Sequence, residues 1–62
     1  MNKEVAEYIN SLLAERERLL EERKDDGKDY ELDFVLKQET EWELGIIYKA
    51  QKSMDYIIEE EN

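Results

Sequence analysis

The apolar residues of the first part of the chain recur at intervals of three, four and seven, the spacing of one face of an α-helix. Asn2 is suited to cap this helix, and Glu4 lies in its first turn, where the helix dipole favours a carboxylate. The pattern predicts a helix over about residues 3–24. Its apolar stripe consists of Val5, Ala6, Ile9, Leu12, Leu13, Leu19 and Leu20.

A second helical pattern covers about residues 30–60. The connection, Asp-Asp-Gly-Lys-Asp, is a turn signal in which Gly27 can take the left-handed conformation and Asp29 can cap the next helix. Because the connection is short, the two helices are expected to pack antiparallel. The sequence predicts an all-α helical hairpin, one domain over residues 1–62. The apolar stripe of the second helix is expected to be Leu32, Val35, Leu36, Ile46, Ile47, Ala50, Met54 and Ile57.

Three charged residues interrupt these stripes, namely Arg16, Glu39 and Glu43. If the chain reverses near Gly27, residue i of the first helix lies level with about residue 55 − i of the second. Arg16 is then level with Glu39 and one turn from Glu43. We expect the three to form a partly buried polar core layer that fixes the register of the helices. The alternative is that the guanidinium of Arg16 extends to water while its stem covers apolar surface.

By the same rule, the second helix extends beyond the end of the first from about residue 53. An exposed apolar patch on a small protein usually marks an interface. We therefore expect two copies to cover each other's ends and form a homodimeric four-helix bundle. A hairpin completed by a different protein is the alternative. The predicted dimer overhang consists of Met54, Tyr56, Ile57 and Ile58.

Another group of large residues is expected to point away from the stripe of the second helix or to lie at its edge. These predicted partner-binding residues are Phe34, Trp42, Leu44 and Tyr48. Tryptophan and tyrosine are favoured anchors of protein interfaces. Gly45 lies on the same side, and a glycine within a helix costs about 1 kcal/mol relative to alanine. Close approach of another backbone would compensate for that cost, and a helix kink is the alternative.

The composition restricts the chemistry available to a chain of 62 residues, near the lower limit for folding alone. Cysteine and histidine are absent, which excludes disulfides and the usual zinc, haem and iron–sulfur ligands. The aspartates of residues 25–29 lack the ligand spacing of a calcium-binding loop. Glu39 and Glu43 superficially resemble the acidic metal sites of helical nucleotide pyrophosphohydrolases and di-iron bundles, but di-iron sites require histidine. We expect no cofactor, no metal and no catalytic residue, and hence no enzyme.

The net charge is −9, and residues 25–62 carry twelve acidic and four basic side chains. Such a chain repels nucleic acid and anionic lipid, so direct binding to either is not expected. It lacks the apolar run of a signal peptide or a membrane span, and a cytoplasmic location is the default expectation. A basic protein surface is the partner that best suits the charge.

These features together predict a small acidic protein-interaction module, an adaptor or inhibitor that binds another protein through the second helix without catalysis. A nucleic-acid mimic is one alternative, with carboxylates blocking a basic DNA- or RNA-binding surface. The other is a purely structural dimerisation module.

Overall fold

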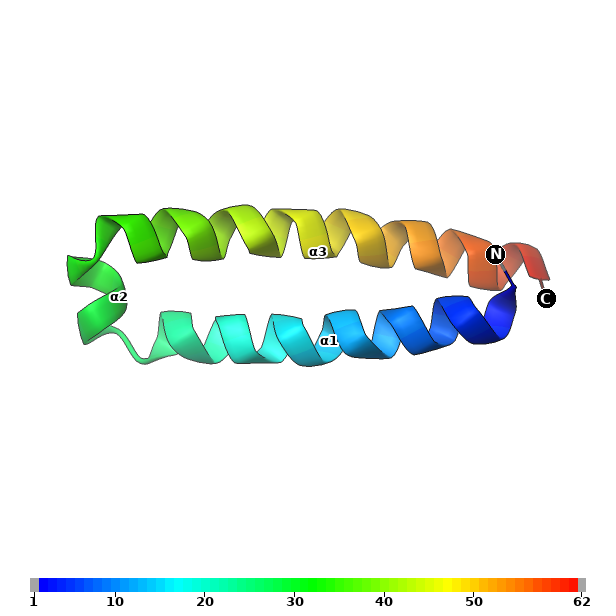
Figure 1. Ribbon diagram of the computed structural model, residues 1–62, viewed down its shortest axis with the longest axis horizontal. Helices are drawn as coiled ribbons and strands as arrows, with labels where there is room; N and C mark the ends of the chain where they lie inside the picture. Colours follow the sequence, from blue (N-terminus) through cyan, green and yellow to red (C-terminus); the bar gives the residue numbers. More distant parts are fainter. Residues whose placement is uncertain (1, 62) are drawn as a thin grey trace.

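The computed structural model describes residues 2–61, apart from the side chains of residues 28, 29 and 61. Its helices are α1 (Lys3–Asp25), α2 (Lys28–Leu32) and α3 (Phe34–Glu61). The two long helices lie side by side and run antiparallel, with the short α2 joining them at one end (Figure 1). The predicted all-α antiparallel hairpin is confirmed.

Local capping explains where α1 begins and ends. The side chain of Asn2 accepts a hydrogen bond from the backbone N–H of Val5 at 2.9 Å, as the sequence predicts. After the last turn of α1, Gly27 takes φ = +73°, a conformation that favours glycine because it has no Cβ. The predicted turn at Gly27 is therefore confirmed. The proposed cap by Asp29 lies outside the described side chains.

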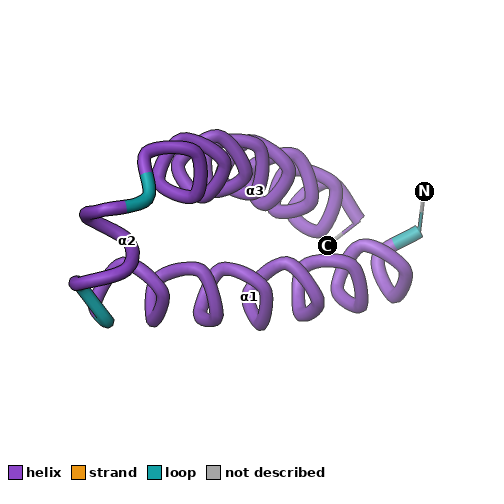
Figure 2. The backbone as a smooth tube through the Cα atoms, turned by 60° about the vertical axis from the view of Figure 1, so that its left-hand side comes forward, coloured by secondary structure: helices purple, strands orange, loops and turns teal. Residues whose placement is uncertain are grey.

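The second helix differs from the prediction because the chain breaks it at Asp33. The Asp33 carboxylate accepts a hydrogen bond from the backbone N–H of Leu36 at 3.0 Å and so caps α3. The residues before it form the separate turn α2, which lies across the end of the hairpin (Figure 2). The predicted single helix over residues 30–60 is thus two helices.

This additional turn changes the register of the hairpin. Asn10 donates a hydrogen bond to Asp55 (2.9 Å), and Gln51 donates one to Glu17 (2.7 Å). Residue i of α1 therefore lies level with about residue 65 − i of α3, roughly ten residues further along than predicted.

The corrected register removes the predicted overhang, because the last turns of α3 lie beside the first turns of α1 (Figure 1). Residues Met54, Ile57 and Ile58 are half-buried within the hairpin, and Tyr56 is exposed on its surface. The prediction failed because α2 lengthens the connection between the long helices.

The core lies where Leu20 of α1 packs with Leu44 and Ile47 of α3, and Leu13 packs against this cluster. Thr40 is also fully buried, and its hydroxyl accepts a hydrogen bond from Arg23 at 3.2 Å. The buried face of α3 is therefore rotated from the predicted stripe. The predicted stripe residues Leu32, Val35 and Ile46 are exposed.

None of the described helices is long and apolar enough to span a membrane.

Candidate interaction surfaces

One long side of the hairpin, here called the polar edge, is closed by side-chain hydrogen bonds between α1 and α3. Its three pairs are Asn10–Asp55, Glu17–Gln51 and Glu21–Tyr48. Within each helix these residues follow helical spacing, so they form one continuous row. The polar edge consequently has few unsatisfied groups to offer a partner.

Tyr48, a predicted partner-binding residue, belongs to this polar edge. Its hydroxyl donates a hydrogen bond to the Glu21 carboxylate at 2.6 Å. That hydrogen bond raises the pKa of Tyr48 to about 12, and desolvation of the phenol and the charges of Glu21 and Glu17 act in the same direction. Tyr48 therefore joins the helices rather than pointing away from them.

The raised pKa of Tyr48 makes this contact measurable. Because the folded-state pKa exceeds the ordinary value of 10.0, the stabilisation is present below about pH 10 and is lost as pH rises towards 12. In an absorbance titration of tyrosinate, Tyr48→Phe should remove one late-titrating phenol. Glu21→Gln should instead keep that phenol and lower the pKa of Tyr48. If the phenol lost in Tyr48→Phe titrates near pH 10 and Glu21→Gln leaves the titration unchanged, the contact does not form in solution.

The opposite side of the hairpin carries the ion pair between Arg16 and Glu43. The Arg16 guanidinium donates from Nε to Oε2 of Glu43 at 2.5 Å and from Nη2 to Oε1 at 3.1 Å. This hydrogen bonding lowers the pKa of Glu43, against the opposing effect of partial burial. The side chains remain 46% and 35% exposed.

The predicted polar core layer is thus corrected in two respects. Arg16 and Glu43 do meet, but at the surface rather than in the core. Glu39 is exposed, and the guanidinium of Arg16 donates to Glu43 through both Nε and Nη2. The shifted register is the reason, since it places Arg16 beyond Glu39 along α3. A pair this exposed contributes little to stability by itself.

Aliphatic side chains surround this ion pair on both helices. On α1, Leu12 and Leu19 lie one turn before and one turn after Arg16, and on α3 Ile46 lies one turn after Glu43. Val5 continues the row towards the start of α1. These four aliphatic residues are each between 45% and 49% exposed. Together with the Arg16–Glu43 pair they are called the apolar edge.

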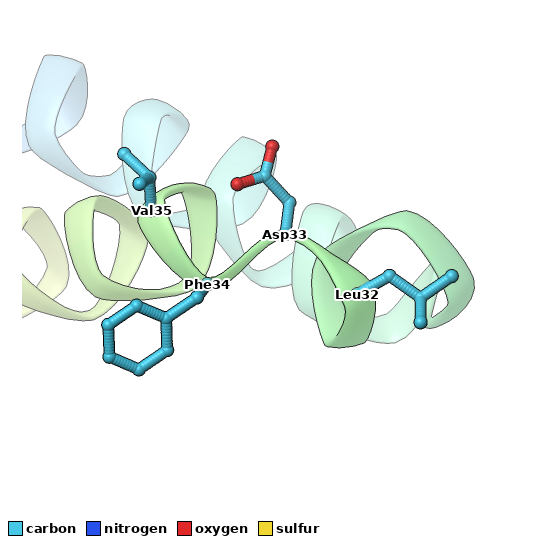
Figure 3. A pocket seen from close by; sticks show the side chains of 4 residues that line it. All are labelled: Leu32, Asp33, Phe34 and Val35. Carbon is cyan, nitrogen blue, oxygen red and sulfur yellow. The ribbon is translucent and has the colours of Figure 1, made fainter.

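A third surface is the outer face of α3, directed away from α1. Trp42 is 70% exposed and Phe34 is 68% exposed on this face. One shallow hollow beside Trp42 is lined by Gln38, Glu39 and Glu41. A second hollow, at the start of α3, is lined by Leu32, Asp33, Phe34 and Val35, and Figure 3 shows Phe34 and Val35 pointing to different sides of the helix.

The four predicted partner-binding residues therefore lie on three different parts of the hairpin. Phe34 and Trp42 lie on the outer face, Tyr48 lies on the polar edge, and Leu44 is buried in the core. The buried face of α3 follows a heptad spacing, with alternating steps of four and three residues. The apolar pattern does not reveal this face because two of its positions are polar. The positions are Thr40, Leu44, Ile47, Gln51, Met54 and Ile58.

Among the described residues, no group of three or more histidine, cysteine, aspartate or glutamate side chains is placed to hold a metal ion. Comparison with protein-family models, with curated proteins and with solved structures finds no match to this chain. The function must therefore be inferred from its own surfaces.

Proposed function

We propose that this protein is a small, non-catalytic interaction module that binds another protein through the outer face of α3. The exposure of Trp42 and Phe34 on one helix is the observation that supports the proposal. Neither ring is needed to complete the core, which forms from Leu20, Leu44 and Ile47. Large aromatic side chains exposed in this way are the usual anchors of protein interfaces.

The charges near Trp42 indicate the kind of partner. Glu39 and Glu41 line the hollow beside the ring, and the chain as a whole has a net charge of −9. Complementary charge accelerates encounter and suppresses wrong partners. A lysine or arginine of the partner can also lie over the tryptophan ring. A basic protein surface is therefore the partner that we propose.

We also propose that the hairpin acts as a homodimer, with the two copies forming a four-helix bundle. Its solvent-accessible surface is 4872 Å², against about 4,250 Å² expected for a compact monomer of its mass. Its radius of gyration is 14.1 Å, against about 10.6 Å for a globular domain of this length. One pair of helices leaves aliphatic residues of the apolar edge about half exposed, and a second pair would cover them.

Affinity capture with quantitative mass spectrometry tests the partner-binding face. Trp42→Ala should reduce the amount of captured partner at least tenfold, since central aromatic anchors contribute about 2 kcal/mol or more. Tyr56→Ala is the matched control, because Tyr56 is an equally exposed aromatic residue on α3 that lies far along the helix from Trp42. Capture should be unchanged in this control.

The same experiment separates the alternatives. If Glu39→Lys and Glu41→Lys abolish capture while Trp42→Ala does not, and binding is strongly salt-dependent, the protein is a nucleic-acid mimic. If wild-type protein enriches no partner over a control capture that lacks the protein, the chain is a structural dimerisation module.

A further inference from the structure

The apolar edge extends along the side of the hairpin where Arg16 meets Glu43. Its aliphatic residues Val5, Leu12, Leu19 and Ile46 are each covered on one side by the hairpin and open on the other, which is why about half of each is exposed. In a four-helix bundle, residues at this position are covered by the second pair of helices. The polar edge has no such row, because its side chains pair with one another.

We infer that the apolar edge is the surface on which a second copy of this chain packs, an inference that rests on the proposed homodimer. The monomer exposes roughly 600 Å² more surface than a compact protein of its mass, because it is an elongated pair of helices. A second copy supplies the same aliphatic row, so the contact is isologous and closes at two chains.

Charge favours this edge over the polar edge. Two copies of a chain with net charge −9 repel each other wherever uncompensated carboxylates meet. The polar edge carries Glu17, Glu21 and Asp55. At the apolar edge the charges of Arg16 and Glu43 cancel within each chain, and Glu39, one turn before Glu43, adds a single carboxylate. Two copies can therefore approach there at a lower electrostatic cost than along the polar edge.

The ion pair also gives the interface a register. Two N–H groups of Arg16 are hydrogen-bonded to Glu43, out of the five that a guanidinium possesses. The remaining donors belong to a side chain that is 46% exposed along this edge. They can reach a carboxylate of that copy, and four alternating charges then form a polar layer between the chains. Slipping the two copies by one turn would remove the contacts between the chains and leave only the ion pair within each one.

Analytical ultracentrifugation over a range of concentrations tests this surface. Leu12→Glu combined with Leu19→Glu places four new carboxylates in the dimer interface and should raise the dimer dissociation constant at least 100-fold. Phe34→Glu adds the same type of charge to the outer face of α3 and should leave the dissociation constant unchanged. The reverse ranking would overturn the assignment of the apolar edge while leaving the dimer intact. A wild-type protein that stays monomeric would instead overturn the proposed homodimer.

A second measurement does not depend on disrupting the dimer, so it is not affected by variants that unfold when they dissociate. The chain lacks cysteine, so Leu12→Cys and its neighbour Ser11→Cys each introduce a single thiol. Consecutive helical residues point about 100° apart, which places the Ser11 position away from the apolar edge. Maleimide labelling of Leu12→Cys should slow at least tenfold as the protein dimerises, and that of Ser11→Cys should not. Equal rates in the dimer would mean that the second copy packs elsewhere.

Discussion

Leu20→Ala should lower the free energy of unfolding by about 2–5 kcal/mol, the largest effect that we expect of a single substitution. The Leu20 side chain is fully buried and packs with Leu44 and Ile47. Truncation removes its apolar contacts and leaves a cavity that two helices can close only partly. A domain of this length has a total stability on the order of 3–9 kcal/mol. The loss is therefore a large fraction of the total stability, and the variant should unfold at a much lower urea concentration than the wild type.

Urea denaturation followed by circular dichroism measures this loss, with both proteins at the same concentration because dimerisation adds to stability. Leu32→Ala is the matched control. Leu32 is 86% exposed, so the same change should alter the free energy of unfolding by less than about 0.5 kcal/mol. Comparable losses from the two variants would mean that Leu32 is buried, as the sequence pattern predicted. That result would contradict its exposure in the structure.

The two glycines should respond to alanine with opposite signs. At Gly27, φ is +73° and an added Cβ would meet the Asp25 carbonyl oxygen at an ordinary 3.7 Å. The cost is therefore one of backbone conformation, about 1–2 kcal/mol for an L-residue in the left-handed region. At Gly45, α3 continues unbroken and an added Cβ would meet nothing within 4 Å. Alanine there should stabilise the helix by about 1 kcal/mol.

Thermal unfolding of Gly27→Ala and Gly45→Ala at one protein concentration measures both effects. The melting temperature should fall in the first variant and rise in the second. A fall in the second variant would mean that another backbone approaches Gly45 in solution, the close approach that its position in the sequence suggested. Because Gly45 lies away from the apolar edge, its substitution should leave dimerisation unchanged.

The proposed dimer and the proposed partner site use different surfaces of the same hairpin. The apolar edge lies along the side between α1 and α3, whereas Trp42 and Phe34 lie on the outer face of α3. A dimer formed through the apolar edge would therefore expose two copies of the partner-binding face. Two linked sites raise the overall avidity for a partner that is itself repeated or dimeric. Loss of the dimer should then weaken capture of such a partner even when Trp42 is intact.

Local signals were sufficient to predict the architecture. Asn2 caps α1 and Gly27 takes a positive φ because each of these conformations depends on a single residue and its immediate neighbours. The helical periodicity and the short turn require an antiparallel hairpin. Arg16 and Glu43 could be proposed as partners because both interrupt an apolar pattern, although Glu39, which interrupts it as well, is not part of the pair.

The candidate surfaces were less accessible from the pattern, because they depend on which face of α3 is buried. The apolar pattern predicted that Leu44 points away from α1. In the structure Leu44 lies on the face of α3 that packs against α1, together with Thr40 and Gln51. A buried threonine is acceptable there because Arg23 hydrogen-bonds its hydroxyl, and that donor comes from the other helix. Phe34 and Trp42 kept their predicted exposure, since no element of the described chain packs over them.

The sequence by itself determined the first helix, the turn at Gly27 and the antiparallel arrangement, since each follows from contacts within a few residues along the chain. Only the tertiary structure decided the register and the buried face. Both depend on Asp33, whose side chain caps α3 and ends α2, and so shifts the pairing of the long helices by about ten residues. A single cap is a small local effect, but every contact between two antiparallel helices depends on where the second one begins.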